Sequence, residues 1–493
     1  MSLKVLFVAS EVHPLVKTGG LADVAGALPR ALARLGADVR LLLPAYRGVA
    51  ARVPDLREVG RLELAAAPAA RLLRGRMPGS RARVYLLDIP ELYDRPGGPY
   101  TGPDGRDWPD NAWRFAALGR AAVALALGEG DPRWRPDLVH AHDWQAGLAP
   151  ALLSLERERP ATVFTVHNLA YQGVFPWETF RDLALPWELW SMERLEYYGQ
   201  FAFIKGGLAC ADWLTTVSPT YAREIQTPEH GFGLDGLLRH RAARLVGILN
   251  GIDHEEWSPG RDPHLAARFT RRTLARRARN KAAVQARFGL PAHAGAPLLG
   301  HIGRLVEQKG ADLILGALDG LLAHGAQLVV LGSGAPHLEQ AVREAAARYP
   351  DRVGVHVGYD EPLAHLIEGG VDMFLMPSRF EPCGLNQMYS LRYGAVPVVR
   401  RTGGLADTVV DADGAALAEG RATGFVFDAP EPGALLEACR RAIACYRDRP
   451  ADWRRIVLTG MAQDFSWRAS ARRYLELYRR ALDGRSRAAP GGV

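Results

Sequence analysis

Short apolar runs alternate with longer amphipathic stretches along most of this chain. In the first half the runs predict buried strands at residues 4–9, 39–43, 84–88, 138–141, 162–165, 213–217 and 245–249. Ala-rich segments between some of them, such as 21–35 and 113–127, are predicted to be helices. This alternation is typical of βαβ units on a parallel sheet.

Near residue 250 the pattern breaks and then begins again. Residues 250–253 (Asn-Gly-Ile-Asp) form a turn signal, and 257–260 have the composition of a connector. Further strands are expected at 298–302, 327–331, 353–357, 373–376, 396–399 and 424–427. A chain of 493 residues also exceeds one domain, since domains hold about 100–200 residues. We therefore expect two doubly wound α/β domains, covering 1–253 and 254–464.

Composition and charge narrow the class of protein. Hydrophobic residues make up 48% and charged residues 23%, which is the balance of a globular protein. Part of the net charge of +7 comes from the acid-free run Arg271, Arg272, Arg276, Arg277 and Arg279. We interpret this run as a solvated helix face. It also motivates nucleic-acid binding as an alternative, although no aromatic side chains are interleaved with it.

The cysteines and the apolar runs bear on the compartment. Cys210, Cys383, Cys439 and Cys445 lack the paired spacing of a disulfide framework or a zinc site, which indicates a reducing environment. The apolar N-terminal run turns polar at Ser10, too early for a secretory signal. No apolar stretch reaches the roughly 20 residues of a membrane span. We expect a cytoplasmic protein with neither membrane nor nucleic acid as a partner.

One motif occurs twice. The sequence KTGGLAD at 17–23 reappears as RTGGLAD at 401–407, and each copy is expected to follow a strand and begin a helix. Two adjacent glycines let the backbone approach a ligand, and free N–H groups at a helix start favour an anion. We interpret the copies as phosphate-binding turns with Lys17 and Arg401 as attached cations. The G-x-G-x-x-G fingerprint and the P-loop are both absent, which disfavours a nicotinamide enzyme and a nucleotide hydrolase.

Two further loops of the second half carry charge directly after a predicted strand. Arg304 and Lys309 follow strand 298–302, and together they can neutralise the charge on a departing diphosphate. Glu381 follows strand 373–376, at the strand end where open α/β sheets hold ligands. Its carboxylate can bind sugar hydroxyls or balance positive charge at an anomeric carbon. The neighbouring Cys383 is assigned no catalytic role.

In the first half, polar clusters follow strands 138–141 and 162–165. The residues are His140, His142, Asp143 and Trp144 after the first strand and His167 and Asn168 after the second. Two histidines and an aspartate can suggest a metal, but no further cluster with ligand spacing completes such a site. We favour hydrogen bonds from His167 and Asn168 to sugar hydroxyls. Trp144 is interpreted as a stacking platform for a sugar ring, with a core tryptophan as the alternative.

These motifs resemble those of bacterial glycogen synthases and plant starch synthases, which are retaining glucosyltransferases that use ADP-glucose. The resemblance covers nearly the whole chain. Its motifs are Ser10-Glu11, 17–23, Asp110-Asn111 with Arg114-Phe115, 142–144, 167–173, 250–253, Arg304 with Lys309, 381–385 and 401–407. One position departs from the family pattern, because Gln145 stands where the family commonly has histidine.

The resemblance implies a GT-B fold, with two facing Rossmann-like domains, the active site in the cleft between them and a last helix, about 465–484, that completes the first domain. It implies no cofactor and no metal. The catalytic residues it implies are Arg304, Lys309, Glu381 and His167. The substrate-binding residues are Lys17, Gly19, Gly20, Asp23, Trp144, Asn168, Asn250, Cys383, Gly384, Leu385, Thr402, Gly403 and Gly404. The tail 485–493 is expected to be disordered.

The expected activity is transfer of glucose from ADP-glucose to the non-reducing end of an α-1,4-glucan such as glycogen, with retention of the α anomer. No residue chosen from chemistry alone distinguishes ADP from UDP. Three alternatives stay open at this point: a glycosyltransferase with another acceptor, a non-catalytic glucan-binding protein and a nucleic-acid-binding protein. Glucan-primed incorporation of glucose separates the first two from the expected activity.

Overall fold

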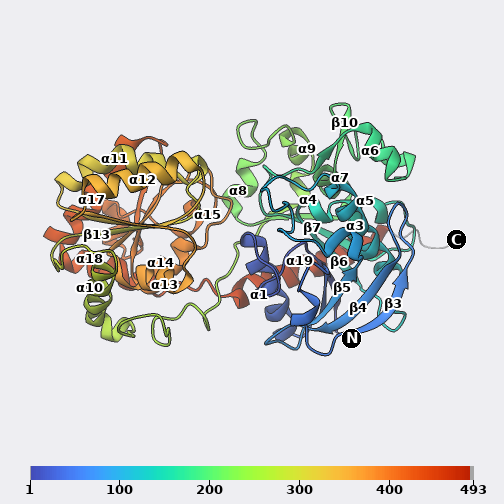
Figure 1. The fold of residues 1–493 in the computed structure, drawn as a ribbon, viewed down its shortest axis with the longest axis horizontal. Coiled ribbons are helices and arrows are strands. Elements are labelled where there is room, and N and C mark those ends of the chain that lie inside the picture. The colour runs from blue at the N-terminus through green and yellow to red at the C-terminus, as the bar shows by residue number, and fades with distance from the viewer. Residues whose placement is uncertain (1, 489–493) are drawn as a thin grey trace. The chain divides into compact units, whose positions relative to one another are not determined.

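A computed structural model describes residues 2–488 and divides into two compact units (Figure 1). The first unit consists of Met1–Gly251 together with the chain from Trp467 onward. The second unit is Ile252–Ser466. The first unit was expected to extend to residue 253, and its first segment ends at 251. The second unit was expected to end at residue 464, and it ends at 466. Each unit has its own sheet and is described by itself.

The first unit is built on a 9-stranded sheet with the order β12-β11-β7-β6-β1-β2-β5-β4-β3. Seven of the strands run parallel: β1 (Lys4–Val8), β2 (Asp38–Pro44), β5 (Arg83–Asp88), β6 (Leu138–His142), β7 (Ala161–Val166), β11 (Trp213–Thr216) and β12 (Leu245–Gly247). All seven coincide with predicted strands to within two residues at either end. Strand prediction succeeds here because these runs are buried on both faces.

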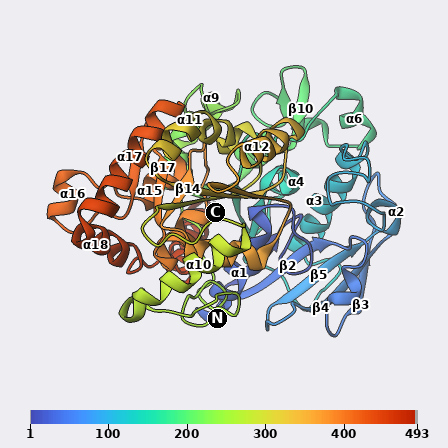
Figure 2. The ribbon, with the colours of Figure 1, turned by 60° about the vertical axis from the view of Figure 1, so that its left-hand side comes forward.

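Two antiparallel strands at one edge of this sheet were not predicted. β3 (Arg57–Leu62) and β4 (Ala70–Arg76) pair beside β5, as Figure 2 shows. Both strands carry arginine and glycine among their apolar residues, and β3 is largely exposed. The small sheet β8 (Val174–Phe175), β10 (Gln200–Ala202) and β9 (Glu196–Tyr197) was also missed. Strands of two or three residues are too short to show any periodicity.

The last helix belongs to the first unit. α19 (Trp467–Ala488, red in Figure 1) packs on α1 (Gly20–Arg34) and on β7. Tyr478 and the ring of His140 on β6 share a 2.7 Å hydrogen bond, and Ser470 donates to the carbonyl of Leu249. The helix continues through residues 485–488, where disorder was expected. The remainder of the expected disordered tail, 489–493, lies outside the described residues.

The second unit is built on a 6-stranded parallel sheet with the order β15-β14-β13-β16-β17-β18. The strands are β13 (Leu298–Ile302), β14 (Gln327–Gly332), β15 (Val353–Val357), β16 (Met373–Met376), β17 (Val396–Arg400) and β18 (Phe425–Phe427). Successive residues point to opposite faces, so Leu328 and Val330 enter one core cluster while Val329 and Leu331 enter the other. The sheet is therefore buried on both sides, as in a doubly wound fold.

Helices cover both faces of this second sheet (Figure 1). One face is covered by α11 (Ala311–Ala323), α12 (Pro336–Arg348) and α17 (Pro432–Asp448). The other face is covered by α10 (Arg277–Arg287) and α13 (Glu361–Gly370), which contribute Val284, Leu363 and Ile367 to the core.

The basic run is divided between solvent and core. Arg271, Arg272, Arg276 and Arg279 are exposed, which confirms a solvated face for those four. Arg277 instead donates to the carbonyl of Val371 at 2.5 Å, and Lys281, just beyond the run, is buried in an ion pair with Asp372 at 2.7 Å. The interpretation as a solvated face was therefore wrong for Arg277, because the start of α10 packs against the end of α13.

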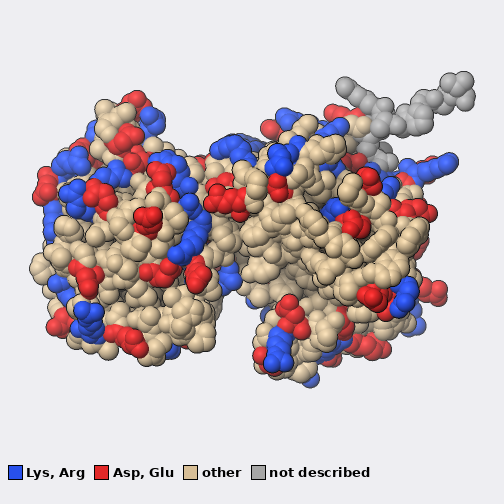
Figure 3. All heavy atoms as spheres, turned by 90° about the horizontal axis from the view of Figure 1, so that it is seen from above, with Lys and Arg blue, Asp and Glu red and all other residues tan. Residues whose placement is uncertain are grey.

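Charges of both signs are mixed over the surface. On the face drawn in Figure 3, basic and acidic side chains are interspersed on each unit. A continuous basic surface of the kind that tracks a nucleic-acid backbone is not visible on that face. Among the described helices, none combines the length and the apolar composition that a bilayer crossing requires.

Candidate functional site

The predicted site residues follow the carboxyl ends of parallel strands. In the first unit β1 lies between β2 and β6, so the strand order reverses there, and in the second unit β13 lies between β14 and β16. Open α/β sheets hold ligands outside the carboxyl ends of their strands at such points. Lys17 follows β1 and His142 ends β6, while Arg304 follows β13 and Glu381 follows β16. Each unit therefore carries one half-site at its own switch point.

In the first half-site a buried carboxylate holds the glycine turn. Glu11 is 4% exposed and accepts the backbone N–H groups of Thr18 and Gly19. Its other oxygen accepts a 3.1 Å hydrogen bond from the hydroxyl of Tyr100. Burial raises the pKa of Glu11, and the two backbone N–H groups act against this rise. Glu11 thus fixes the position of the 17–20 segment.

Lys17 and Asp23 form a 2.8 Å ion pair within the same motif. The lysine side chain is 41% exposed, so the pair lies at the surface of the unit. Asp23 was predicted to bind substrate, and the structure gives it the additional role of orienting Lys17. In the second copy the cation is held differently, because Arg401 pairs with Asp428 from outside its motif.

The two glycine pairs also differ, which corrects the common interpretation of the repeated motif. The N–H of Gly404 donates to the carbonyls of Glu381 and Pro382, and a Cβ on Gly404 would lie 2.0 Å from the carbonyl oxygen of Cys383. These glycines permit close backbone packing between two turns. In the first copy, Gly19 N–H is bound to Glu11, whereas no atom lies within 4 Å of a Cβ on Gly20. Within residues 2–488, the N–H of Gly20 has no protein partner and can meet an anion.

This difference predicts that a Gly→Ala substitution has different effects on stability in the two copies of the motif. Gly404→Ala is expected to destabilise the protein by about 1–3 kcal/mol, because the backbone of Cys383 must move to admit the methyl group. Gly20→Ala should change the free energy of unfolding by no more than about 0.5 kcal/mol, because Gly20 lies at the start of α1 with open space beside it. Urea unfolding of both variants checks this, and equal destabilisation would contradict the assigned roles.

The histidines of the first half-site are neutral. A 3.0 Å hydrogen bond joins Nδ1 of His142 to Nε2 of His167. Burial lowers the pKa of His167 to about 3, and it holds the pKa of His142 well below its usual value. The bond occupies Nε2 of His167, and among the described side chains its Nδ1 has no partner. His167 can therefore offer Nδ1 to a sugar hydroxyl without carrying charge.

Asp143 supports this arrangement from a strained position. Its φ of 56° lies in the left-handed region, and its carboxylate accepts the backbone N–H of His167 at 2.7 Å. Burial, aided by the charge of Glu11, raises the pKa of Asp143 to about 7 in spite of that hydrogen bond. The role of Asp143 was not predicted from the sequence, although backbone strain of this kind concentrates at functional sites.

Two residues of the 140–144 segment are structural. Both ring nitrogens of His140 are hydrogen-bonded, one to Tyr478 and one to Thr165 at 2.6 Å, so the ring has no nitrogen left for a metal. Trp144 is 9% exposed and packs edge-on against Phe115 at 4.9 Å. The prediction that Trp144 stacks on a sugar ring is not retained, since an aromatic cluster that includes Phe175 and Phe203 surrounds the indole.

Three amide side chains complete the first half-site. Asn168 accepts the backbone N–H of Ala170 at 3.1 Å, which shapes the loop after β7. Asn250 and Gln145 are 6% exposed, and the amide oxygen of each lacks a hydrogen-bond partner among the described atoms. A buried amide oxygen without a partner is uncommon, so both oxygens are candidates for a ligand or a bound water.

In the second half-site the two predicted loops meet. The ammonium of Lys309 lies 2.5 Å from Oε2 of Glu381, and the hydroxyl of Ser378 donates to the same oxygen at 3.0 Å. Glu381 is buried, with a side chain that is 7% exposed. Its other oxygen, Oε1, accepts no bond from any residue in the described range. The carboxylate can thus bind a sugar hydroxyl through Oε1 while Lys309 balances its charge.

Backbone contacts explain why these loops lie together. Gly310 has a φ of +73°, and a Cβ there would lie 2.3 Å from the carbonyl oxygen of Pro377. The N–H of Arg379 donates to the carbonyl of Gln308 at 2.8 Å, and its guanidinium grips Asp312 with two hydrogen bonds. Sequence reasoning missed these supporting residues, because nothing in the local pattern indicates which loops meet.

The remaining predicted residues divide into accessible and buried groups. Arg304 is exposed, and its guanidinium makes a long 3.4 Å hydrogen bond to Gln308. Cys383 is buried, and its carbonyl accepts from Gln387, which also fills the space beside Gly384 at φ +69°. Leu385 directly precedes α14 (Asn386–Tyr393), while Thr402 and Gly403 are buried. Arg304 is thus accessible to a ligand, whereas Cys383, Thr402 and Gly403 are buried.

Comparison with known proteins shows to which family this chain belongs. Residues 4–240 match the family described as starch synthase catalytic domain, and 285–456 match glycosyl transferases group 1. A glycogen synthase from Thioalkalivibrio sulfidiphilus is 58% identical over 97% of this chain and 99% of its own length. The chain belongs to the glycogen synthase family. Glycogen synthase 1 from Methylococcus capsulatus is 57% identical over 98% of this chain and 97% of its own.

Solved structures agree with this membership of the glycogen synthase family. The catalytic domain of starch synthase IV from Arabidopsis thaliana, solved with ADP and acarbose, has a TM-score of 0.87 at 34% identity. The match covers 98% of this chain and all of that one. A sucrose-phosphate synthase from Thermosynechococcus elongatus shares the fold, with a TM-score of 0.58 at 17% identity. The expected GT-B fold and a glucosyltransferase activity are thereby confirmed. The family acts with a nucleotide-sugar donor and a glucan acceptor.

Proposed function

We propose that this protein transfers glucose from ADP-glucose to the non-reducing end of an α-1,4-glucan, with retention of the α anomer, in the cytoplasm. The observation that carries the proposal is the Lys309–Glu381 pair beside the exposed Arg304, at the switch point of the second sheet. The ADP bound in the related starch synthase structure supports the choice of nucleotide. The choice of compartment rests on the cysteine spacing in the sequence, which lacks the pairs of a disulfide framework.

The second half-site binds the leaving group. Arg304 and Lys309 stabilise the departing diphosphate electrostatically, and stabilisation of this kind usually contributes most to the catalysis of such reactions. Glu381 binds the glucose ring through its free oxygen. With two cations in place, the reaction needs no divalent metal for this task.

The first half-site contributes to the same transfer. Lys17 and the N–H of Gly20 contact the donor, and the neutral His167 hydrogen-bonds a hydroxyl of the transferred glucose through Nδ1. The acceptor 4-hydroxyl attacks on the face that the diphosphate leaves, and its proton passes to the departing phosphate. Retaining glycoside hydrolases, which form a covalent glycosyl-enzyme, place two carboxylates about 5 Å apart. Glu381 is engaged by Lys309 and Ser378, and the proposed transfer uses no covalent glucosyl-enzyme.

The activity is tested by transfer of radiolabelled glucose to glycogen, comparing ADP-glucose with UDP-glucose at equal concentrations and without added metal. We expect incorporation from ADP-glucose to exceed that from UDP-glucose at least about tenfold, a difference of about 1.4 kcal/mol in transition-state binding. Equal use of both donors contradicts the donor assignment alone. No incorporation from either donor by folded protein would indicate another acceptor or a binding role.

A further inference from the structure

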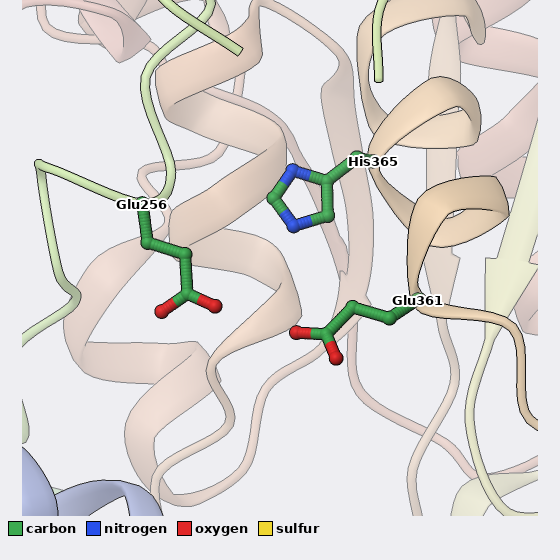
Figure 4. Close-up of side chains that lie close together, drawn as sticks. All are labelled: Glu256, Glu361 and His365. Atoms are coloured by element: carbon green, nitrogen blue, oxygen red, sulfur yellow. The ribbon is translucent and has the colours of Figure 1, made fainter. Parts of the chain in front are cut away.

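One cluster of metal-ligand side chains lies outside both half-sites. Among the described residues, Glu256, Glu361 and His365 bring one ligand atom each to within 4.8 Å of one another. Figure 4 shows the two carboxylates and one nitrogen of the imidazole facing a common point. Glu256 belongs to residues 252–270, the connector that precedes the first helix of the second unit, whereas Glu361 and His365 lie on α13. Their i, i+4 spacing places both on one face of that helix.

The histidine is held in the orientation of a metal ligand. Nδ1 of His365 is 2.7 Å from Oδ2 of Asp262, which is fully buried and also accepts from Tyr393. The ring stacks on Trp257 at 3.7 Å between centroids. A carboxylate that accepts the N–H of a ligating histidine is the usual support of such a ligand, because it fixes the tautomer and the ring orientation. Here it fixes the lone pair on Nε2.

Nε2 of His365, the ring nitrogen that faces the carboxylates, is not engaged in a hydrogen bond within the described residues. His365 is 3% exposed, and for Nε2 no hydrogen-bond partner exists anywhere in residues 2–488. Nε2 of this mostly buried ring points toward the two carboxylates, so it can bind an ion that also meets them. Glu361 is additionally positioned by a 2.8 Å hydrogen bond from Tyr359 to its Oε2.

We propose that Glu256, Glu361 and His365 form a binding site for a divalent transition-metal ion, with Zn²⁺ as the best match. Imidazole is a borderline donor that suits Zn²⁺, Zn²⁺ also accepts carboxylate oxygens, and three protein ligands leave the fourth position to water. Bonds of about 2.0–2.2 Å place tetrahedral ligand atoms about 3.4 Å apart. Atoms that are up to 4.8 Å apart must therefore close by up to about 1.4 Å, which side-chain rotation of the exposed Glu256 and the half-buried Glu361 can achieve.

The ion joins the connector to the helix. Glu256, Trp257 and Asp262 all come from the connector, and the metal bonds add a direct link from it to α13. The site stabilises the start of the second unit and takes no part in glucosyl transfer. Binding to the folded state alone raises stability by mass action, so a hundredfold excess of free metal over Kd should raise the Tm by on the order of 5 °C.

The test uses the full chain, stripped with a chelator and titrated with Zn²⁺ by calorimetry. We expect one equivalent to bind, Glu256→Gln and Glu361→Gln each to weaken binding at least about tenfold, and the double variant to lose it. Glu255→Gln is the matched control, because it removes the same charge from the adjacent exposed residue and should bind as the parent does. His365 is not substituted, since its loss would leave Asp262 buried with a lost partner.

Co²⁺ supplies a second readout. Its ligand-field bands should report a four-coordinate site in the parent and be absent from the double variant. Failure of the parent to bind one equivalent overturns the proposal. So does Zn²⁺ binding with unchanged Kd in the double variant, which would point to the cysteines or to the protein surface.

Discussion

Arg304→Ala is expected to lower kcat for glucosyl transfer by about 10²–10³-fold while leaving the Tm unchanged. The side chain is exposed and makes one long hydrogen bond to Gln308, so its loss removes little folding energy. The diphosphate gains negative charge as it leaves, and the guanidinium binds this more charged form more tightly, so the loss should appear chiefly in kcat. Steady-state kinetics with ADP-glucose and a thermal scan of the same preparation measure both quantities.

Arg271→Ala is the matched control for this experiment. Arg271 is another exposed arginine of the second unit, and its removal changes the net charge equally. Its kcat should match that of the parent. Lys309→Ala also removes a cation, but it leaves the buried carboxylate of Glu381 with one fewer partner and confounds rate with stability. Near-normal turnover of Arg304→Ala would refute the assigned role of the guanidinium.

Asp143→Asn is expected to change the dependence of stability on pH. In the unfolded chain this carboxyl ionises near pH 3.8, whereas the folded protein raises its pKa to about 7. Between these values the unfolded state has released the proton and the folded state has not. Stability of the parent therefore falls as pH rises from about 4 to about 7. Asparagine does not ionise, tolerates a positive φ and can accept the same backbone hydrogen bond.

The size of this effect follows from the pKa difference. At about 1.4 kcal/mol per pKa unit, the raised pKa of Asp143 can lower the stability of the parent above pH 7 by at most about 4 kcal/mol. Because the side chain is only half-buried, solvent screening reduces this to an expected gain of about 2 kcal/mol for Asp143→Asn. Urea unfolding of variant and parent at several pH values measures the difference, which should vanish near pH 4.

Asp212→Asn gives the opposite sign and serves as the control. Burial acts to raise the pKa of Asp212, but hydrogen bonds from Arg159 and Thr162 outweigh it and lower that pKa. This carboxylate therefore stabilises the fold at neutral pH and loses that contribution in acid. Asp212→Asn should be less stable than the parent at pH 7. If Asp143→Asn also lost stability there, the raised pKa of Asp143 would be refuted.

The sequence by itself determined the parallel strands and the loops that carry charge. Strands such as β13 and β16 are continuous apolar runs because helices cover both faces of a parallel sheet. Such runs can be recognised in the sequence alone. The order of strands and helices then places Arg304, Lys309 and Glu381 at strand ends, where such sheets hold ligands. Antiparallel edge strands such as β3 escaped prediction, since a half-exposed strand with arginine and glycine has no apolar run.

What each side chain does was decided by the tertiary structure, because it depends on partners that are distant in sequence. The repeated TGG motif is identical in both copies, yet Gly404 packs against the backbone of Cys383 while Gly20 faces open space. Trp144 resembles a sugar platform in the sequence, but Phe115 and its neighbours bury it. Neutral His167, the raised pKa of Asp143 and the Glu256–Glu361–His365 cluster arise from burial and from contacts between elements. The local sequence pattern encodes burial and the order of elements along the chain, whereas the electrostatic environment of a side chain is a property of the folded chain.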